Sequence, residues 1–141
     1  MVRVTAKITN KPRYRSVLKD YEGDLRALIG RAGNLVRNTA VTSVNQGVKT
    51  GGVSTRYNPR RTHTASAAGQ PPATDTGFLA TNIVLEIDVN QLGASVESRA
   101  NYSTALEFGT SKMAARPFMQ PALEENKPKI NRLAKQMIKA K

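Results

Sequence analysis

The 141-residue sequence contains no cysteine and no tryptophan, has a single histidine, and is only 5% aromatic. Without cysteine, the chain can form neither a disulfide framework nor a thiolate metal site. This composition suits a protein that is made and used in a reducing cytoplasm. No apolar run approaches the ~20 residues that a membrane span requires, and the first residues, Met-Val-Arg-Val-Thr-Ala-Lys, lack the apolar segment of a signal peptide. We therefore expect a soluble protein that uses neither a membrane nor this export route.

Motifs of catalysis and cofactor binding are also lacking. His63 lies among glycine, proline and serine residues, with no partner that the sequence fixes. There is no nucleophile elbow, phosphate-binding loop or dinucleotide fingerprint, and no metal-ligand spacing. Glu124 and Glu125 are adjacent residues in the first part of an expected helix, where negative charge is favourable in any case. The sequence predicts neither an enzyme nor a cofactor.

Acidic residues are scarce relative to basic ones. The chain has 10 Asp and Glu against 22 Lys and Arg, which gives a formal net charge of +12. An excess of this size favours association with acidic partners and polyanions. The surface is then either basic and solvated, or matched to an acidic protein neighbour, or a dedicated nucleic-acid site. The low aromatic content argues against the stacking platforms that bind single strands.

The length corresponds to one domain spanning residues 1–141. Val2, Val4 and Ala6 alternate with polar residues and predict a short edge strand. From about residue 16 to about residue 46, apolar residues recur every three or four positions and predict one long amphipathic helix. Gly30 and Gly33 are unfavourable in a helix interior, so a bend or a close approach by another element would explain them.

The second half begins with a clear strand pattern. Residues 81–90 alternate between apolar and polar side chains, and residues 94–100 return after Asn90-Gln-Leu-Gly93, which predicts a hairpin. Glu86, Asp88 and Glu97 would share its polar face, either as a solvated surface or as a cation site. After Pro121 the chain reads as a terminal helix, in which Pro128 predicts a kink or a break.

Residues 47–80 are the most irregular part of the sequence, with repeated glycine, proline, serine and threonine. We expect a long and flexible loop, since structureless stretches of this length are usually functional or disordered. Its centre is basic and carries Arg56, Tyr57, Arg60, Arg61 and His63. It is either a solvated loop or an arm that orders against a neighbouring protein or against DNA phosphates.

Residues 102–122 contain the most distinctive pattern of the chain. Glu107-Phe-Gly-Thr110 and Arg116-Pro-Phe-Met-Gln-Pro-Ala122 predict two rigid turns, because each proline restricts its own backbone and that of the preceding residue. Gly109 permits a bend that a larger residue would strain. Phe108 and Phe118 are expected to anchor both turns on an otherwise aliphatic core, after a short helix or turn over residues 102–108.

These motifs resemble those of a known family. Tyr102 followed by Glu-Phe-Gly-Thr, then Arg-Pro-Phe-x-x-Pro-Ala and a basic terminal helix, resembles the tail-completion or head–tail joining proteins of the neck of long-tailed bacteriophages. Upstream, residues 69–79 are similar to the family's Pro-Pro-x-x-x-Thr-Gly-x-Leu turn. The matches cover roughly residues 65–141, in the family's order. Pro128 and the length and basic character of the 47–64 segment depart from that pattern.

The resemblance implies an α+β fold, in which a long N-terminal helix and a C-terminal helix pack on a small antiparallel sheet, with a long loop before the central hairpin. It implies a structural virion protein that assembles in the host cytoplasm into a ring, a hexamer in the family. Implied partners are copies of the chain, the head connector or head-closure protein, and the tail terminator or tail tube protein. The residues expected at subunit or partner interfaces are Arg56, Tyr57, Arg60, Arg61, Glu107, Phe108, Arg116 and Phe118.

Two alternatives remain at this point. Within the virion, a tail terminator or a minor tail component would carry the same motifs. In a different class, the chain would be a sequence-independent nucleic-acid-binding protein. Its candidate phosphate contacts are Arg56, Arg60, Arg61, Lys135 and Lys139. The two classes can coexist in the neck, where non-specific DNA contact is also expected.

Overall fold

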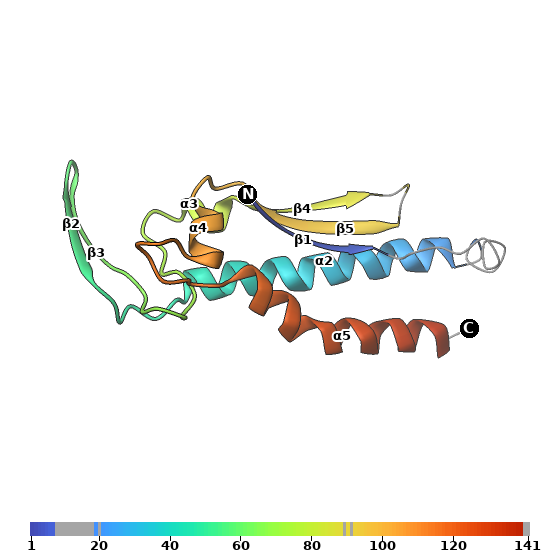
Figure 1. Ribbon diagram of the computed structural model, residues 1–141. Coiled ribbons are helices and arrows are strands. Elements are labelled where there is room, and N and C mark those ends of the chain that lie inside the picture. The colour runs from blue at the N-terminus through green and yellow to red at the C-terminus, as the bar shows by residue number, and fades with distance from the viewer. Residues whose placement is uncertain (8–18, 20, 89, 91, 140–141) are drawn as a thin grey trace.

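The protein is described from a computed structural model that defines residues 1–7, 19, 21–88, 90 and 92–139. A small sheet lies along the long helix α2, and the C-terminal helix α5 runs beside α2 (Figure 1). A two-stranded arm extends from one end of this body. The expected α+β class, with a long helix toward each end of the chain and a small antiparallel sheet, is confirmed.

The main sheet has three antiparallel strands in the order β1 (Val2–Lys7), β5 (Gly93–Ser98) and β4 (Ile83–Asp88). The predicted edge strand and the predicted hairpin are both confirmed. The strand closing the hairpin is central because both β1 and β4 pair with it. Position Val89, which the sequence pattern places on the apolar face of β4, lies outside the described residues.

Helix α2 (Glu22–Asn45) packs against β4 and β5. The predicted helix is confirmed and ends within a residue of the expected position, whereas its expected start near residue 16 falls outside the described residues. The structure gives a reason for glycine at position 33 within the helix, because a Cβ there would lie 2.4 Å from a methyl group of Leu85. The helix therefore approaches the sheet more closely there than alanine would allow in the present packing.

The hydrophobic core lies between the sheet, α2 and the start of α5. Short helix α3 (Phe78–Thr81) closes one end of it, and α4 (Ser103–Phe108) follows β5. The core is aliphatic except for one phenylalanine, as expected from the low aromatic content. Its buried residues are Val2, Val36, Ala40, Val44, Leu79, Ala80, Ile83, Val96, Ala100, Phe118, Met119 and Ala122.

The segment 47–80 differs from its prediction. Instead of a continuous irregular loop, it contains strands β2 (Val53–Tyr57) and β3 (Arg60–Thr64), followed by α3. Asn58 and Pro59, joined by a cis peptide bond, form the turn between the strands. The strands consist largely of threonine, arginine and other polar residues, so the apolar alternation that marks a half-buried strand is missing.

Helix α5 (Met119–Lys139) includes Pro128 without ending there. Of the kink or break expected at Pro128, the break does not occur, and the helix changes direction along its course in Figure 1. Proline removes one backbone donor and opposes the carbonyl four residues earlier. Helix α5 packs against α2 and β1, and these contacts support the helix on both sides of Pro128. Asn126 contributes by donating to Thr39 Oγ1 of α2 at 2.8 Å from a fully buried position.

The outer face of the sheet carries an ion-pair network rather than three free carboxylates. Glu97 is only 3% exposed and receives hydrogen bonds from Arg3 at 2.9 Å and from Arg99 at 3.0 Å. Glu86 pairs with the same two arginines. The hydrogen bond from Arg99 lowers the pKa of Glu97 from its ordinary value despite opposition from burial, and Arg3 lowers it further. The same pairing raises the pKa of Arg99.

This network predicts a specific acid response. Because the pKa of Glu97 is lower in the folded protein than in the unfolded chain, its stabilisation is fully present above the ordinary pKa of 4.5 and disappears as pH falls through the folded value. We expect Glu97→Gln to lower the free energy of unfolding at neutral pH and to flatten its fall below pH 4.5. Urea denaturation at several pH values measures both effects. An unchanged acid slope in the variant would contradict this account.

Candidate functional site

The distinctive stretch 102–122 is organised by a buried carboxylate. Glu107, the penultimate residue of α4, is 4% exposed. Its Oε2 accepts backbone hydrogen bonds from Phe118 at 2.9 Å and Met119 at 3.0 Å, and its Oε1 accepts one from Gln120 at 2.8 Å. These N–H groups lie at the start of α5, where a helix has no internal acceptors. Glu107 therefore caps α5 from a different helix, and its negative charge complements the helix dipole.

The turn after α4 depends on Gly109. Its backbone has φ 75° and ψ −178°, a conformation that is essentially restricted to glycine. A Cβ there would also lie 2.9 Å from the carbonyl oxygen of Met113 and from the nitrogen of Ala115. The chain then returns toward α4, where the Arg116 N–H donates to the Leu106 carbonyl at 2.6 Å. The predicted bend at Gly109 is confirmed.

The two phenylalanines of this stretch have opposite environments. Phe118 is 1% exposed and belongs to the core, which confirms its predicted role as an anchor. Phe108 is 72% exposed, so the same prediction for Phe108 is wrong. Helical geometry explains the difference, because successive side chains point about 100° apart. With Glu107 directed inward to cap α5, the next side chain is directed away.

Backbone contacts connect this junction to the arm. Gly69 N–H donates to the carbonyl of Ala115 at 2.8 Å, and Thr74 N–H donates to Val44 at the end of α2 at 3.2 Å. Next to this loop, Asp75 forms an ion pair of 3.0 Å with Arg61 of β3. The arm is thereby joined to the α4–α5 junction and to the body at its base.

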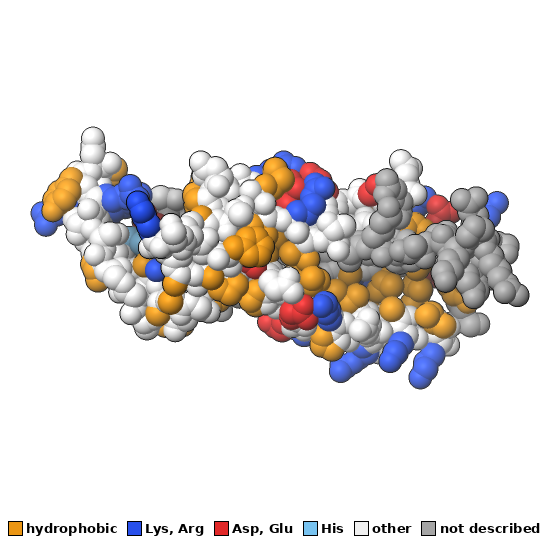
Figure 2. Space-filling view, viewed as in Figure 1, with side chains coloured by type: hydrophobic (Ala, Val, Ile, Leu, Met, Phe, Trp, Pro, Cys, Tyr) orange, Lys and Arg blue, Asp and Glu red, His pale blue; other side chains and the backbone are white. Residues whose placement is uncertain are grey.

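The arm has two chemically different faces, because alternate residues of a strand point to opposite sides. Arg56 lies opposite Arg61 in the strand register, and Tyr57 lies opposite Arg60. Arg56, Arg61 and His63 face inward and line a cleft between the arm and the body. On the other face Tyr57 is 80% exposed. Hydrophobic and basic side chains both appear on the arm in Figure 2.

The cleft has a volume of about 510 Å³. Leu79, Leu106 and the tilted pair of Phe78 and Tyr102, with ring centroids 6.3 Å apart, line its body side. Burial, followed by the nearby Asp75 charge, raises the pKa of Tyr102, so its hydroxyl is neutral at physiological pH. The cleft thus combines a predominantly apolar wall with arginine side chains.

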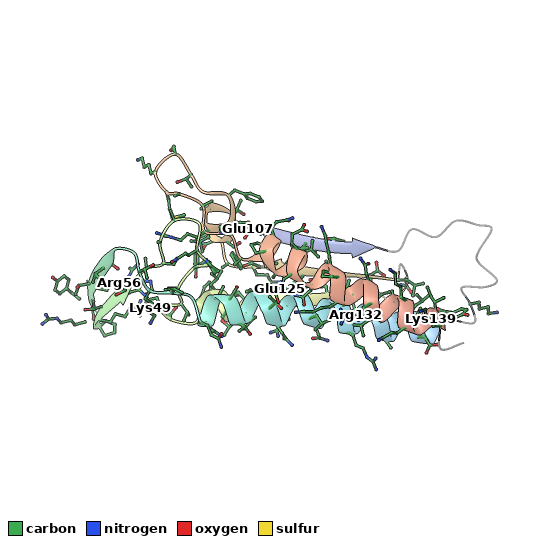
Figure 3. All side chains as sticks on the ribbon, turned by 90° about the horizontal axis from the view of Figure 1, so that it is seen from below. Lys49, Arg56, Glu107, Glu125, Arg132 and Lys139 are labelled. Carbon is green, nitrogen blue, oxygen red and sulfur yellow. The ribbon has the colours of Figure 1, made fainter. Side chains whose placement is uncertain are left out.

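The residues selected from the sequence fall into three groups. Arg56, Tyr57, Arg60 and Arg61 lie together on the arm, and Arg116 lines the cleft beside them. Glu107 and Phe118 are buried and support this region from beneath, while Phe108 is exposed nearby. Lys135 and Lys139 lie on α5, whose C-terminal half is at the opposite end of the molecule (Figures 1 and 3). The candidate phosphate contacts therefore do not form one continuous patch.

Sequence reasoning missed the aromatic and acidic members of the cleft. Phe78 is 51% exposed, and Tyr102 is 42% exposed, although both are of a type usually buried in cores. Asp75 lies in the Thr-Asp-Thr-Gly segment, and its pairing with β3 spans 14 residues of chain. Only recognition of the β2–β3 hairpin would have placed Asp75 opposite an arginine.

Replacement of the capping carboxylate tests the first element of the site. We expect Glu107→Gln to reduce the free energy of unfolding by about 1–2 kcal/mol, because an amide offers one acceptor oxygen and no charge to three donors. Glu125→Gln is the matched control, since Glu125 is an exposed residue of α5, the helix that Glu107 caps, and forms an ion pair with Lys129 (Figure 3). It should cost less than about 0.5 kcal/mol. Equal losses in urea denaturation would refute the capping role.

A second variant tests the turn. Gly109→Ala should cost about 2–3 kcal/mol, because the backbone conformation disfavours a Cβ and the adjacent backbone atoms occupy its position. Gly52→Ala is a suitable control, because a Cβ there meets no atom within 4 Å. Thermal and urea denaturation of both variants measure the difference. A Gly109→Ala protein as stable as the control would show that the turn relaxes without strain.

Within the described ranges, no three His, Asp or Glu side chains come together as a metal site. None of the helices among those residues is both long and apolar enough to cross a membrane. Comparison of the chain with protein-family models, curated proteins and solved structures finds no match.

Proposed function

We propose that this chain is a structural virion protein of the phage neck, a tail-completion protein that joins the tail to the head connector as part of a ring. The proposal begins from the resemblance of the motifs in residues 69–79 and 102–122 to that family. The observation that carries it further is the arm, a projecting hairpin whose surface is suited to contact with another protein. The same motifs are compatible with a tail terminator or minor tail component.

The arm supports an assembly role because most of its side chains are exposed. All five residues of β2 are exposed, including Val53 at 68% and Tyr57 at 80%. An isolated two-stranded hairpin is only marginally stable in water. Tyrosine and arginine are enriched at the energetic centres of protein interfaces. An arm of this composition gains buried apolar area and order when it lies against a neighbouring protein.

In a ring, each subunit presents one surface to the preceding copy and a different one to the next. The body formed by the sheet, α2 and α5 offers surfaces for such contacts, with the arm at one end. Ring copy number is proposed as six by the resemblance alone. The head connector and the tail tube are the proposed partners on the two sides of the ring.

The neck assignment predicts the phenotype of particles made without this protein. Electron microscopy should show DNA-filled heads beside finished, unattached tails, and expression of the wild-type chain should restore joined particles. Tyr57→Ala should fold but restore them poorly, whereas Ile138→Ala, which removes a comparably exposed apolar side chain from α5, should restore them fully. Normal infectious particles in the absence of the protein would exclude an assembly role.

Sequence-independent nucleic-acid binding is the second candidate. It is favoured by two arginines of the arm, Arg56 and Arg60, that have no carboxylate partner among the described residues, and by the basic residues of α5. The two groups lie far apart (Figure 3). If this were the main role, affinity for duplex DNA would fall with salt at a log–log slope of about −0.9 for each phosphate neutralised. A slope corresponding to fewer than about two phosphates would leave the neck assignment as the better account.

A further inference from the structure

Within the described part of the chain, acidic side chains are too few to pair with all the basic ones. The chain has ten acidic residues, of which only Asp20 lies outside the described part, so nine are described. Each of these nine already makes an interaction within the chain. These residues are Glu22, Asp24, Asp75, Glu86, Asp88, Glu97, Glu107, Glu124 and Glu125.

Of the three arginines that line the cleft, two have no carboxylate partner among the described residues. Arg56 and Arg61 are cross-strand neighbours, and like charges in this position repel. Asp75 pairs with Arg61 at 3.0 Å and leaves Arg56 without a carboxylate partner in the described structure. The Arg116 side chain donates a hydrogen bond to the Met113 sulfur at 3.8 Å, and its buried Nε has no hydrogen-bond acceptor in the described part of the chain. The cleft therefore has an excess of positive charge beside an apolar wall.

We propose that this cleft binds an extended segment of an acidic partner protein, with an apolar side chain against Phe78, Leu79 and Leu106 and carboxylates beside Arg56 and Arg116. A volume of about 510 Å³ is sufficient for a few side chains of such a segment. The carboxylates would relieve the repulsion between the two cross-strand arginines and supply acceptors for guanidinium groups. This inference rests on the proposed neck function, because the acidic protein would be one of the chain's neighbours in the neck.

Charge excludes a second copy of this chain as the preferred occupant. Each copy carries a formal charge of +12, and its described carboxylates are already engaged. Binding another copy here would therefore require breaking an existing pair and bringing two basic surfaces together. Copies in the ring consequently contact one another through other surfaces, and this cleft faces a different component.

A duplex nucleic acid matches the charge but not the shape. Phosphate contacts on a duplex are spread along its backbone, whereas the arginines here converge on a cleft with an aliphatic and aromatic wall. The basic residues of α5 cannot extend the same surface, because they lie at the other end of the molecule (Figure 3). Shape does not distinguish a single strand from a peptide, since bases stack on aromatic rings, so the binding experiment includes oligo(dT).

The test uses a fluorescent synthetic peptide of alternating glutamate and leucine, its analogue with glutamine in place of glutamate, and oligo(dT). Fluorescence anisotropy at about 0.1 M salt measures binding to the full chain. We expect the acidic peptide to bind at least about tenfold more tightly than the glutamine analogue, and Arg56→Gln to weaken it by about threefold to fivefold. Arg56 is exposed, so this variant should fold normally.

A pair of double variants separates the cleft from general charge. Arg56→Gln/Arg116→Gln should reduce acidic-peptide affinity more than about tenfold, whereas Arg31→Gln/Arg132→Gln, with the same loss of charge, should change it less than about twofold. The control arginines are exposed residues of α2 and α5. Circular dichroism checks that Arg116→Gln remains folded, and the single Arg56→Gln variant decides the result if it does not.

Three results would overturn the inference. Equal losses of affinity in the two double variants would indicate non-specific charge attraction. Similar affinity for both peptides, or no binding of either, would exclude an acidic protein as the occupant of the cleft. Tighter binding of oligo(dT) than of the acidic peptide, lost in Arg56→Gln, would assign the cleft to nucleic acid instead. None of these results depends on particle assembly, so failure here leaves the neck test unaffected. Failure of the neck test likewise leaves peptide binding to be judged by itself.

Discussion

The buried carboxylate of Glu107 and the three backbone donors at the start of α5 are the contact on which the neighbouring structure depends. Placing a carboxylate in the interior is unfavourable unless its charge and its oxygen atoms are satisfied. Here both oxygens accept hydrogen bonds from Phe118, Met119 and Gln120, and the positive end of the helix dipole adds a favourable field. The contact fixes the direction in which α5 leaves the turn, and with it the positions of the buried Phe118 and Met119.

The same junction supports the surface that we assign to binding. Leu106 and Ala115 anchor Arg116 and Gly69 through backbone hydrogen bonds, so the cleft wall and the loop leading from the arm share one support. The arm has a different character, because it is a two-stranded hairpin joined to the body mainly at its base and through Asp75. A stable body beneath a marginally stable arm is the arrangement expected when binding a partner completes the structure.

Periodic patterns accounted for the elements that bury an apolar face. The alternation over β4 and the three-to-four spacing over α2 correctly predicted both elements, since each requires continuous contact with the core. The β2–β3 hairpin escaped prediction because neither of its faces is buried, so its sequence carries no apolar period. The local sequence pattern also predicted a buried Phe108, which is exposed because the preceding residue, Glu107, points inward.

The chemistry of the site was only partly accessible from sequence, because its decisive contacts are non-local. The motif identified Glu107 and Arg116 as important, but the capping contact spans 11 to 13 residues and depends on the turn at Gly109. Arg56 and Arg61 were identified by their charge, whereas the position of Asp75 and the exposed aromatic pair required the folded chain. Composition established that the protein is basic, and the structure shows which of its described basic groups already have acidic partners.

Amide hydrogen exchange at Phe118, Met119 and Gln120 tests the central claim most directly. First-turn amides of an uncapped helix lack internal acceptors and exchange readily with solvent. The account predicts that these three amides are protected to nearly the same extent as the interior of α5, and that Glu107→Gln selectively reduces their protection. Rapid exchange in the wild-type chain, at the rate of an open helix end, would contradict the claim that Glu107 closes this junction.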